Sequence, residues 1–141
     1  MVNEIIKGVS MKLSGKFKGY RVYQNDVRQG LKLPCFFISV LKPDISPLGR
    51  DRFMSRNPLD VMFFPEDESD NNTMLEVAER LVWLLELITL PDGDMLHGTD
   101  KSWHIEGGIL HFFVSFDHTL TRARDEDKIE SADISVGTDE N

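Results

Sequence analysis

Cysteine, long apolar runs and targeting signals are scarce or missing in this chain. A single cysteine, Cys35, excludes a disulfide framework within one chain, which fits a reducing compartment. Because Cys35 lies inside an apolar segment, a buried thiol is favoured over a reactive one. No apolar run approaches the roughly 20 residues of a membrane helix. Met1–Phe17 is amphipathic and lacks the apolar centre of a signal peptide, so we expect no membrane association.

Catalytic signatures are also missing. The sequence contains no nucleophile elbow, phosphate-binding loop or zinc-protease motif. Gly107–Gly108 is typical of a tight turn, and Glu66, Asp67 and Glu68 fall in a turn where water can solvate them. We therefore expect no enzyme activity and no cofactor.

Basic residues are too few and too scattered to hold nucleic acid. The net charge is −8, of which −5 falls between Ala123 and Asn141. The 141 residues are enough for one domain, which we assign to 1–122. The acidic tail, 123–141, is expected to be disordered alone and to become ordered by docking. Ile134 and Val136, at strand spacing, would add to a sheet edge of a neighbour.

The most apolar segment is Cys35–Leu41, which reads CFFISVL between two prolines. A strand with one wet face alternates in polarity, and this segment does not. It is predicted to be a strand covered on both faces, by helices or by another subunit.

Two helices and a long hairpin complete the predicted fold. Apolar periodicity indicates helices over Val2–Phe17 and Met74–Ile88, the second capped by Asn71, Asn72 or Thr73. Met95–Arg122 is predicted to be a hairpin that turns at Gly107–Gly108. A short strand is expected at Tyr20–Tyr23, a loop at Pro43–Asp51, and a strand region broken near Pro58 over Arg52–Phe64. The fold class is α+β, a mixed or antiparallel sheet with the long C-terminal hairpin and both helices packed on it.

Four histidines, His97, His104, His111 and His118, recur every seven residues. The predicted register sets His104 opposite His111 and His97 opposite His118, with the two pairs on opposite faces. Such a hairpin could hold a metal in a small metal- or ligand-binding enzyme, but the histidines do not converge, and solvated histidines are favoured.

A basic cluster stands out in this acidic chain. Arg50, Arg52 and Arg56 lie close together, with Phe53 among them. The alternatives are a solvated strand edge and a contact with an acidic neighbour, including the tail of another copy. We take Arg50, Arg52, Phe53, Arg56, Ile134 and Val136 as the candidate interface.

Five stretches carry a family resemblance: Glu4–Leu13 (EIIKGVSMKL), Gln29–Pro43 (QGLKLPCFFISVLKP), Gly49–Pro65 (GRDRFMSRNPLDVMFFP), Glu76–Glu86 (EVAERLVWLLE) and Gly108–Asp117 (GILHFFVSFD). With these the chain resembles the tail terminator proteins of long-tailed bacteriophages and prophages of Gram-positive hosts. The resemblance implies a small subunit of a ring, usually a hexamer, that ends growth of the tail tube and presents the head-joining surface. Another neck or head–tail joining protein remains the alternative within the same class.

The resemblance also implies partners and a location. The expected partners are further copies of the chain, the tail tube protein, a sheath protein if the tail contracts, and a head–tail connector or neck protein. DNA would only pass through the lumen of the ring. The protein would be assembled in the host cytoplasm and reside in the virion, at the tail end or neck.

Overall fold

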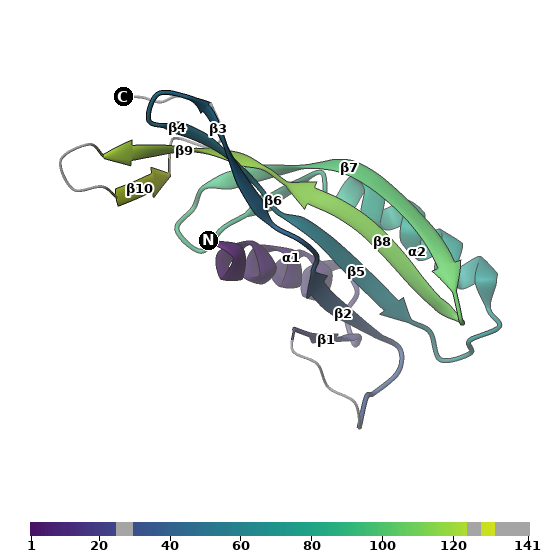
Figure 1. The fold of residues 1–141 in the computed structure, drawn as a ribbon. Helices are drawn as coiled ribbons and strands as arrows, with labels where there is room; N and C mark the ends of the chain where they lie inside the picture. Colours follow the sequence, from purple (N-terminus) through teal and green to yellow (C-terminus); the bar gives the residue numbers. More distant parts are fainter. Residues whose placement is uncertain (25–29, 124–127, 132–141) are drawn as a thin grey trace.

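The computed structural model of the chain describes residues 1–24, 30–123 and 128–131 (Figure 1). Its helices are α1 (Val2–Lys16) and α2 (Asn71–Leu84). The strands are β1 (Arg21–Tyr23), β2 (Cys35–Val40), β3 (Asp44–Gly49), β4 (Arg52–Arg56), β5 (Pro58–Phe64), β6 (Leu87–Thr89), β7 (Met95–Glu106), β8 (Ile109–Phe116), β9 (His118–Ala123) and β10 (Lys128–Ser131). This composition confirms the predicted α+β class.

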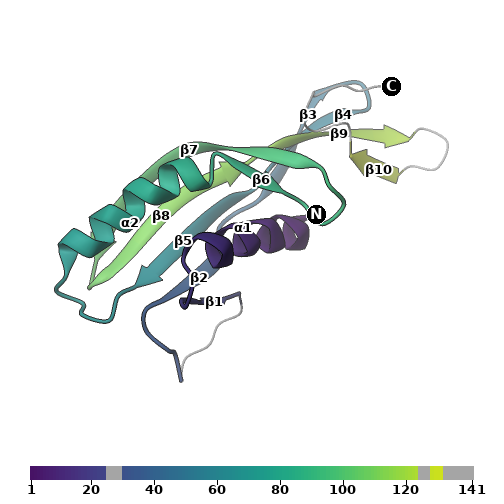
Figure 2. The same cartoon turned by 180° about the vertical axis from the view of Figure 1, so that it is seen from behind.

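The strands form two sheets that share long stretches of chain. The larger sheet has the order β1-β2-β5-β8-β7-β6, antiparallel except for the β1–β2 pair. The smaller sheet has the order β10-β9-β4-β3 and is antiparallel throughout. Strand β4 leads directly into β5, and β8 leads directly into β9. The chain therefore passes between the two sheets at two neighbouring places. In Figures 1 and 2 the smaller sheet projects beyond the helices, and we call it the arm.

Both helices cover the same face of the larger sheet, and Figure 2 shows them in front of it. The pairing of β2, β5 and β8 places a set of fully buried side chains on this helix-covered face. They are Phe36 and Ile38 of β2, Leu59, Val61 and Phe63 of β5, and Leu110, Phe112, Val114 and Phe116 of β8. Leu13 and Leu81 are the corresponding fully buried residues of α1 and α2. Gly8 brings α1 close to β6, since a Cβ there would lie 2.9 Å from the Thr89 carbonyl oxygen.

The second helix begins and ends earlier than its apolar pattern indicates. Asp70 is the N-cap, and its side chain accepts a hydrogen bond from the Thr73 backbone N–H at 3.1 Å. The prediction that Asn71, Asn72 or Thr73 caps the helix was therefore wrong. The helix ends at Leu84, and Ile88 is a buried residue of β6. Apolar periodicity continues past the true end because β6 also places its residues in the core.

Two predictions about the strands need correction. Pro43–Asp51 is mostly strand β3 and not a loop; Pro47 is tolerated because β3 is an edge strand whose register shifts between Pro47 and Gly49. Within one chain the helices cover only one face of β2, so Phe37 on the other face is partly exposed and lies outside the core. Cover of that second face by another subunit stays a prediction. The predicted break near Pro58 is confirmed, at Asn57 between β4 and β5.

The hairpin turns at Gly107 and Gly108, both with positive φ, as predicted. Trp103 pairs with Phe112 and His104 with His111, in the expected register. The register then shifts between Thr99 and Ser102, where Asp100 adopts φ 54°. The hairpin register therefore does not extend to both ends of the predicted segment. The first residues of β7 pair with β6, and β9 belongs to the arm.

Candidate assembly interface

The arm begins at a buried polar corner where both strands leave the larger sheet. Asn57 is only 1% exposed, and its Nδ2 donates to Ser55 Oγ and to the Phe116 carbonyl oxygen, each at 3.1 Å. Its backbone N–H donates to Asp117 Oδ1 at 3.3 Å, and Ser115 Oγ donates to the same oxygen. Since buried polar groups hold their partners strongly, this network fixes where the arm leaves the domain.

The two faces of the arm differ in chemistry. Arg52, Met54 and Arg56 alternate along β4 on one face, where Arg56 Nη1 donates to Ser46 Oγ at 3.1 Å and pairs with Asp44 at 3.5 Å. Phe53 lies on the other face, and the Arg122 guanidinium lies 5.6 Å from its ring centroid. An arginine side and an apolar side therefore lie back to back in one layer.

The predicted interface residues are only partly brought together. Arg52 and Arg56 share a face, Arg50 is exposed in the β3–β4 turn, and Phe53 points to the opposite side from Arg52 and Arg56. Ile134 and Val136 lie outside the described residues. Strand β10 falls within the segment that the sequence set apart as the acidic tail, and its backbone pairs with β9.

Sequence reasoning missed the apolar residues of β3. Ile45 is 57% exposed and Leu48 is 51% exposed. Pairing places Ile45 opposite Ser55, and Pro47 opposite Phe53, on the apolar side of the arm. The two prolines and the glycine around them favoured a loop, and only the strand register reveals that Ile45 shares a side with Phe53.

The second missed surface is the face of the larger sheet opposite the helices, toward the viewer in Figure 1. We call it the open face. It carries Phe37 and Ser39 of β2, Asp60, Met62 and Phe64 of β5, and Ile109, His111 and Phe113 of β8. All its large apolar side chains are partly exposed. No helix among the described residues covers this side.

The histidines do not form a metal site in the described part of the chain. The His104 and His111 rings stack with centroids 5.2 Å apart on the open face. His111 Nδ1 lies 2.8 Å from Asp60 Oδ2, and His104 Nε2 lies 3.3 Å from Glu106 Oε1. No cluster of three or more His, Cys, Asp or Glu is suited to a metal ion within residues 1–24, 30–123 and 128–131.

The outer pair of histidines is not opposed, contrary to the predicted register. His97 pairs with Leu87 across β6 and β7, while His118 pairs with Ser55 in the arm. His118 is 4% exposed, and its burial lowers the pKa of the imidazole below the ordinary value of 6.5. Its neutral ring is part of the packing at the base of the arm.

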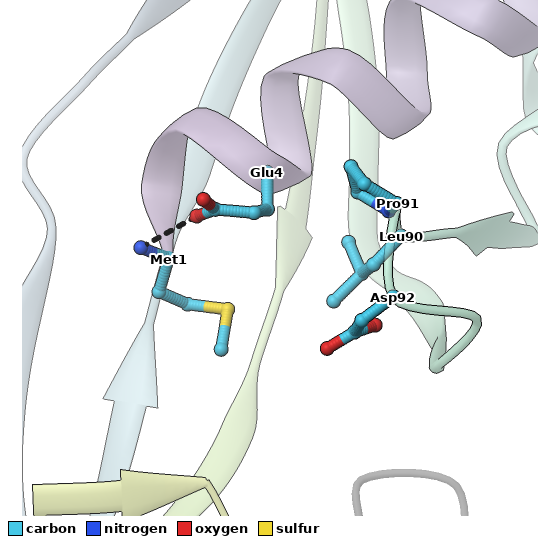
Figure 3. A pocket seen from close by; sticks show the side chains of 5 residues that line it. All are labelled: Met1, Glu4, Leu90, Pro91 and Asp92. Atoms are coloured by element: carbon cyan, nitrogen blue, oxygen red, sulfur yellow. Dashed lines mark ion pairs between the residues drawn. The ribbon is translucent and has the colours of Figure 1, made fainter.

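Two shallow depressions flank the helices. Figure 3 shows the larger, of about 580 Å³, lined by Met1, Glu4, Leu90, Pro91 and Asp92. The smaller, of about 350 Å³, lies between the helices and is lined by Lys16, Arg80, Trp83 and Leu84. Neither lining contains a nucleophile held by a base, so neither offers the arrangement that covalent catalysis requires.

A single-layer arm and an uncovered apolar sheet are features of a subunit that packs against others, and the comparison with known families agrees. The family model described as "Phage tail terminator protein" matches residues 4–128. This chain belongs to the phage tail terminator family. A search of curated proteins found no match. Membership assigns the terminator a structural role in the phage tail and makes it a component of the virion. No helix in the described residues is long and apolar enough to cross a membrane.

Proposed function

We propose that this terminator forms a ring, with six copies expected, on the last ring of the tail tube. The ring ends polymerisation of the tube and presents the surface to which the head is joined. Family membership carries the proposal, and the two-sided arm with the open sheet face supports it. A closed ring needs two different complementary surfaces on each subunit, and these supply candidates for both.

The proposed partners follow from this position. One side of the ring contacts the tail tube protein and the other a neck or head–tail connector protein, with a sheath protein beside it if the tail contracts. DNA passes through the lumen without being held, because the chain is acidic overall. The role is structural and involves neither catalysis nor a cofactor.

The deciding experiment removes the terminator from its phage or prophage. We expect tubes of uncontrolled length that carry no heads, as measured by electron microscopy, and recovery when the intact chain is supplied. Tubes of normal length that fail only to join heads would instead assign the chain to another neck function. Native mass spectrometry of the assembled ring should give a multiple of the 16.1 kDa chain mass.

A further inference from the structure

The open face is unusually apolar for a sheet that meets water. Antiparallel sheets with one wet face alternate apolar and polar residues. Here β2, β5 and β8 place Phe37, Met62, Phe64, Ile109 and Phe113 on the uncovered side. The rings of His104 and Phe113 stack with centroids 5.5 Å apart and extend the flat surface. The helices explain why β2 is apolar on the face that they cover. Its apolar residues on the other face are explained only if another molecule covers that face.

The apolar side of the arm is a second surface without a cover. Ile45, Pro47 and Phe53 share this side, and more than half of the Ile45 side-chain surface meets solvent. Leu120 pairs with Phe53 and is buried. The exposed part of this side is therefore formed by Ile45 and Pro47 of the outer strand β3. We call Ile45, Pro47, Phe53 and Leu120 the apolar face of the arm.

These two surfaces lie on opposite sides of the chain. Side chains alternate along β8 and β9, so His118 and Leu120 point to the same side as Phe116, which is the side that the helices cover. The strand pairing continues across the junction, where the Phe116 N–H donates to the Asn57 carbonyl oxygen. The apolar face of the arm therefore points to the side of the helices, and the open face points away from them.

Opposite placement decides how copies can pack. If two open faces met, the result would be a twofold dimer that can add no further copy there. If the arm of one copy lies on the open face of the next, all copies keep the same orientation, and each presents both surfaces. Such a head-to-tail contact closes into a ring when its rotation divides a full turn.

Charge favours the same arrangement. On the open face, strands β5 and β7 place Asp60 and Glu106. Lys101 of β7 instead reaches helix α2, where its Nζ donates to the Val82 carbonyl oxygen. Among the described residues, strand pairing places one basic side chain on the open face, Arg21 at the outer edge of the sheet. On the arm, Arg122 lies beside Phe53 and pairs with Asp51 at 3.6 Å, and Arg50 lies in the β3–β4 turn. The groove beside Trp83, by contrast, carries Lys16 and Arg80, which would place like charge opposite Arg122.

We propose that the apolar face of the arm of one copy packs on the open face of the next copy, sheet on sheet, and that this contact joins the subunits of the ring. The proposal rests on the ring assembly proposed above and adds the surfaces that make it. Two sheets in such contact pack about 10 Å apart with interdigitating side chains.

Cross-linking between single-site variants tests the contact. Ile45→Cys places a thiol on the arm and Met62→Cys places one in the middle of the open face. The two variants, with distinguishable tags, are mixed, assembled as rings in solution or on purified tail tubes, and treated with a short bismaleimide. Trp83→Cys is the matched control because Trp83 is 77% exposed on the helix side. Buried Cys35 of the unsubstituted chain gives the background.

We expect a cross-linked pair of unlike chains from Ile45→Cys with Met62→Cys, at least tenfold above either variant alone. Ile45→Cys with Trp83→Cys should give only background. Cross-linking of Met62→Cys to itself would overturn the proposal in favour of a twofold contact, and a product with Trp83→Cys would move the arm to the helix side. Rings that form without the expected product refute the contact alone. Absence of rings in both settings refutes the proposed function as well.

A second test avoids any change at the partly buried open face. Ile45→Asp puts charge on an exposed position of the apolar face of the arm, so folding should be retained. We expect at least a tenfold loss in the fraction of chain found in rings, measured by mass photometry, with an unchanged melting temperature. Leu75→Asp, an exposed apolar position of α2, is the matched control and should assemble normally. Normal assembly of the arm variant would exclude the arm as a contact.

Discussion

At the scale of single residues, Leu85 connects helix α2 to the sheet. It is fully buried, and its carbonyl oxygen would lie 2.2 Å from a Cβ at Gly98 of β7. Only a glycine at position 98 permits this approach. The end of the helix is therefore packed on the sheet through the buried Leu85 side chain, and the absence of a side chain at Gly98 lets its backbone come close.

Replacing Leu85→Ala should lower the free energy of unfolding by about 2–5 kcal/mol, because a cavity remains under α2. Urea denaturation of the purified chain measures the change. Trp83→Ala, two residues earlier and exposed, should alter it by less than about 0.5 kcal/mol. Similar values for the two variants would show that the helix does not pack as described.

His118 should make stability depend on pH near neutrality. The unfolded chain protonates this imidazole below its ordinary pKa of 6.5, whereas burial lowers the pKa in the folded chain, against a smaller opposing effect of Asp117. The unfolded state therefore binds more protons, and stability falls as pH decreases from about 6.5 to the lowered folded pKa. It becomes constant in this respect below that value.

Chemical denaturation at pH values from about 8 to about 5 checks this dependence. His118→Gln removes the titrating group and should flatten the profile in that window, whatever its effect on absolute stability. His97→Gln, at an exposed position of β7, is the control and should leave the slope in place. An identical slope in the His118 variant would assign the dependence to another group.

At the scale of elements, the arm is a single layer with two unlike faces. The corner around Asn57 fixes its exit from the domain, and its face with Arg52 and Arg56 lies opposite the apolar one. Both faces remain accessible because no helix among the described residues packs over the outer strands. The arm can therefore contact a neighbouring copy on one side and an acidic partner on the other.

Reversing Arg52→Glu and Arg56→Glu should weaken assembly of the ring while the domain still folds, because the acidic partner then meets like charge. Assembly is measured by mass photometry and folding by the melting temperature. Arg56→Glu also places a carboxylate opposite Asp44, so the melting temperature is recorded for each variant to separate an effect on folding from an effect on assembly. Lys7→Glu with Lys18→Glu, both exposed on or beside α1, is the control with equal charge change. Normal assembly of the arginine variant would remove this face from the interface.

At the scale of the whole molecule, we expect the domain to fold without residues 132–141 of the acidic tail. Removing residues 132–141 leaves β10 and its pairing with β9 in place. The expected docking of Ile134 and Val136 on a neighbour would be lost, together with three acidic side chains. Folding of one chain and attachment to the tail thus become separable.

The chain truncated after Ser131 should keep the melting temperature of the intact chain but attach less to tube ends, as judged by sedimentation with purified tubes. Truncation after Arg122 further removes β10 and reports what that strand contributes. A chain shortened after Ser131 that no longer folds would place the tail in its own core. Heads joined to tails of normal length would show that the tail has no docking role.

The sequence was sufficient for the features governed by local pattern. Apolar periodicity predicted both helices, and the glycine pair predicted the turn and the central register of the hairpin. Family membership was also available from the sequence, because five stretches across the domain carry it. The boundaries failed where different elements share one core: α2 passes into β6 without any change in apolar character, so Ile88 could be assigned to either.

Only the tertiary structure decided how the surfaces are arranged. The side on which Phe53 lies depends on strand pairing across β3, β4 and β9, between residues far apart in the chain. The same holds for the open face. The segment CFFISVL predicted that both faces of β2 are covered, and within one chain the helices cover one of them. A linear pattern records that a residue avoids water, because that depends on its own side chain. It does not record which molecule excludes the water, because that depends on where the rest of the chain, and its neighbours, come to lie.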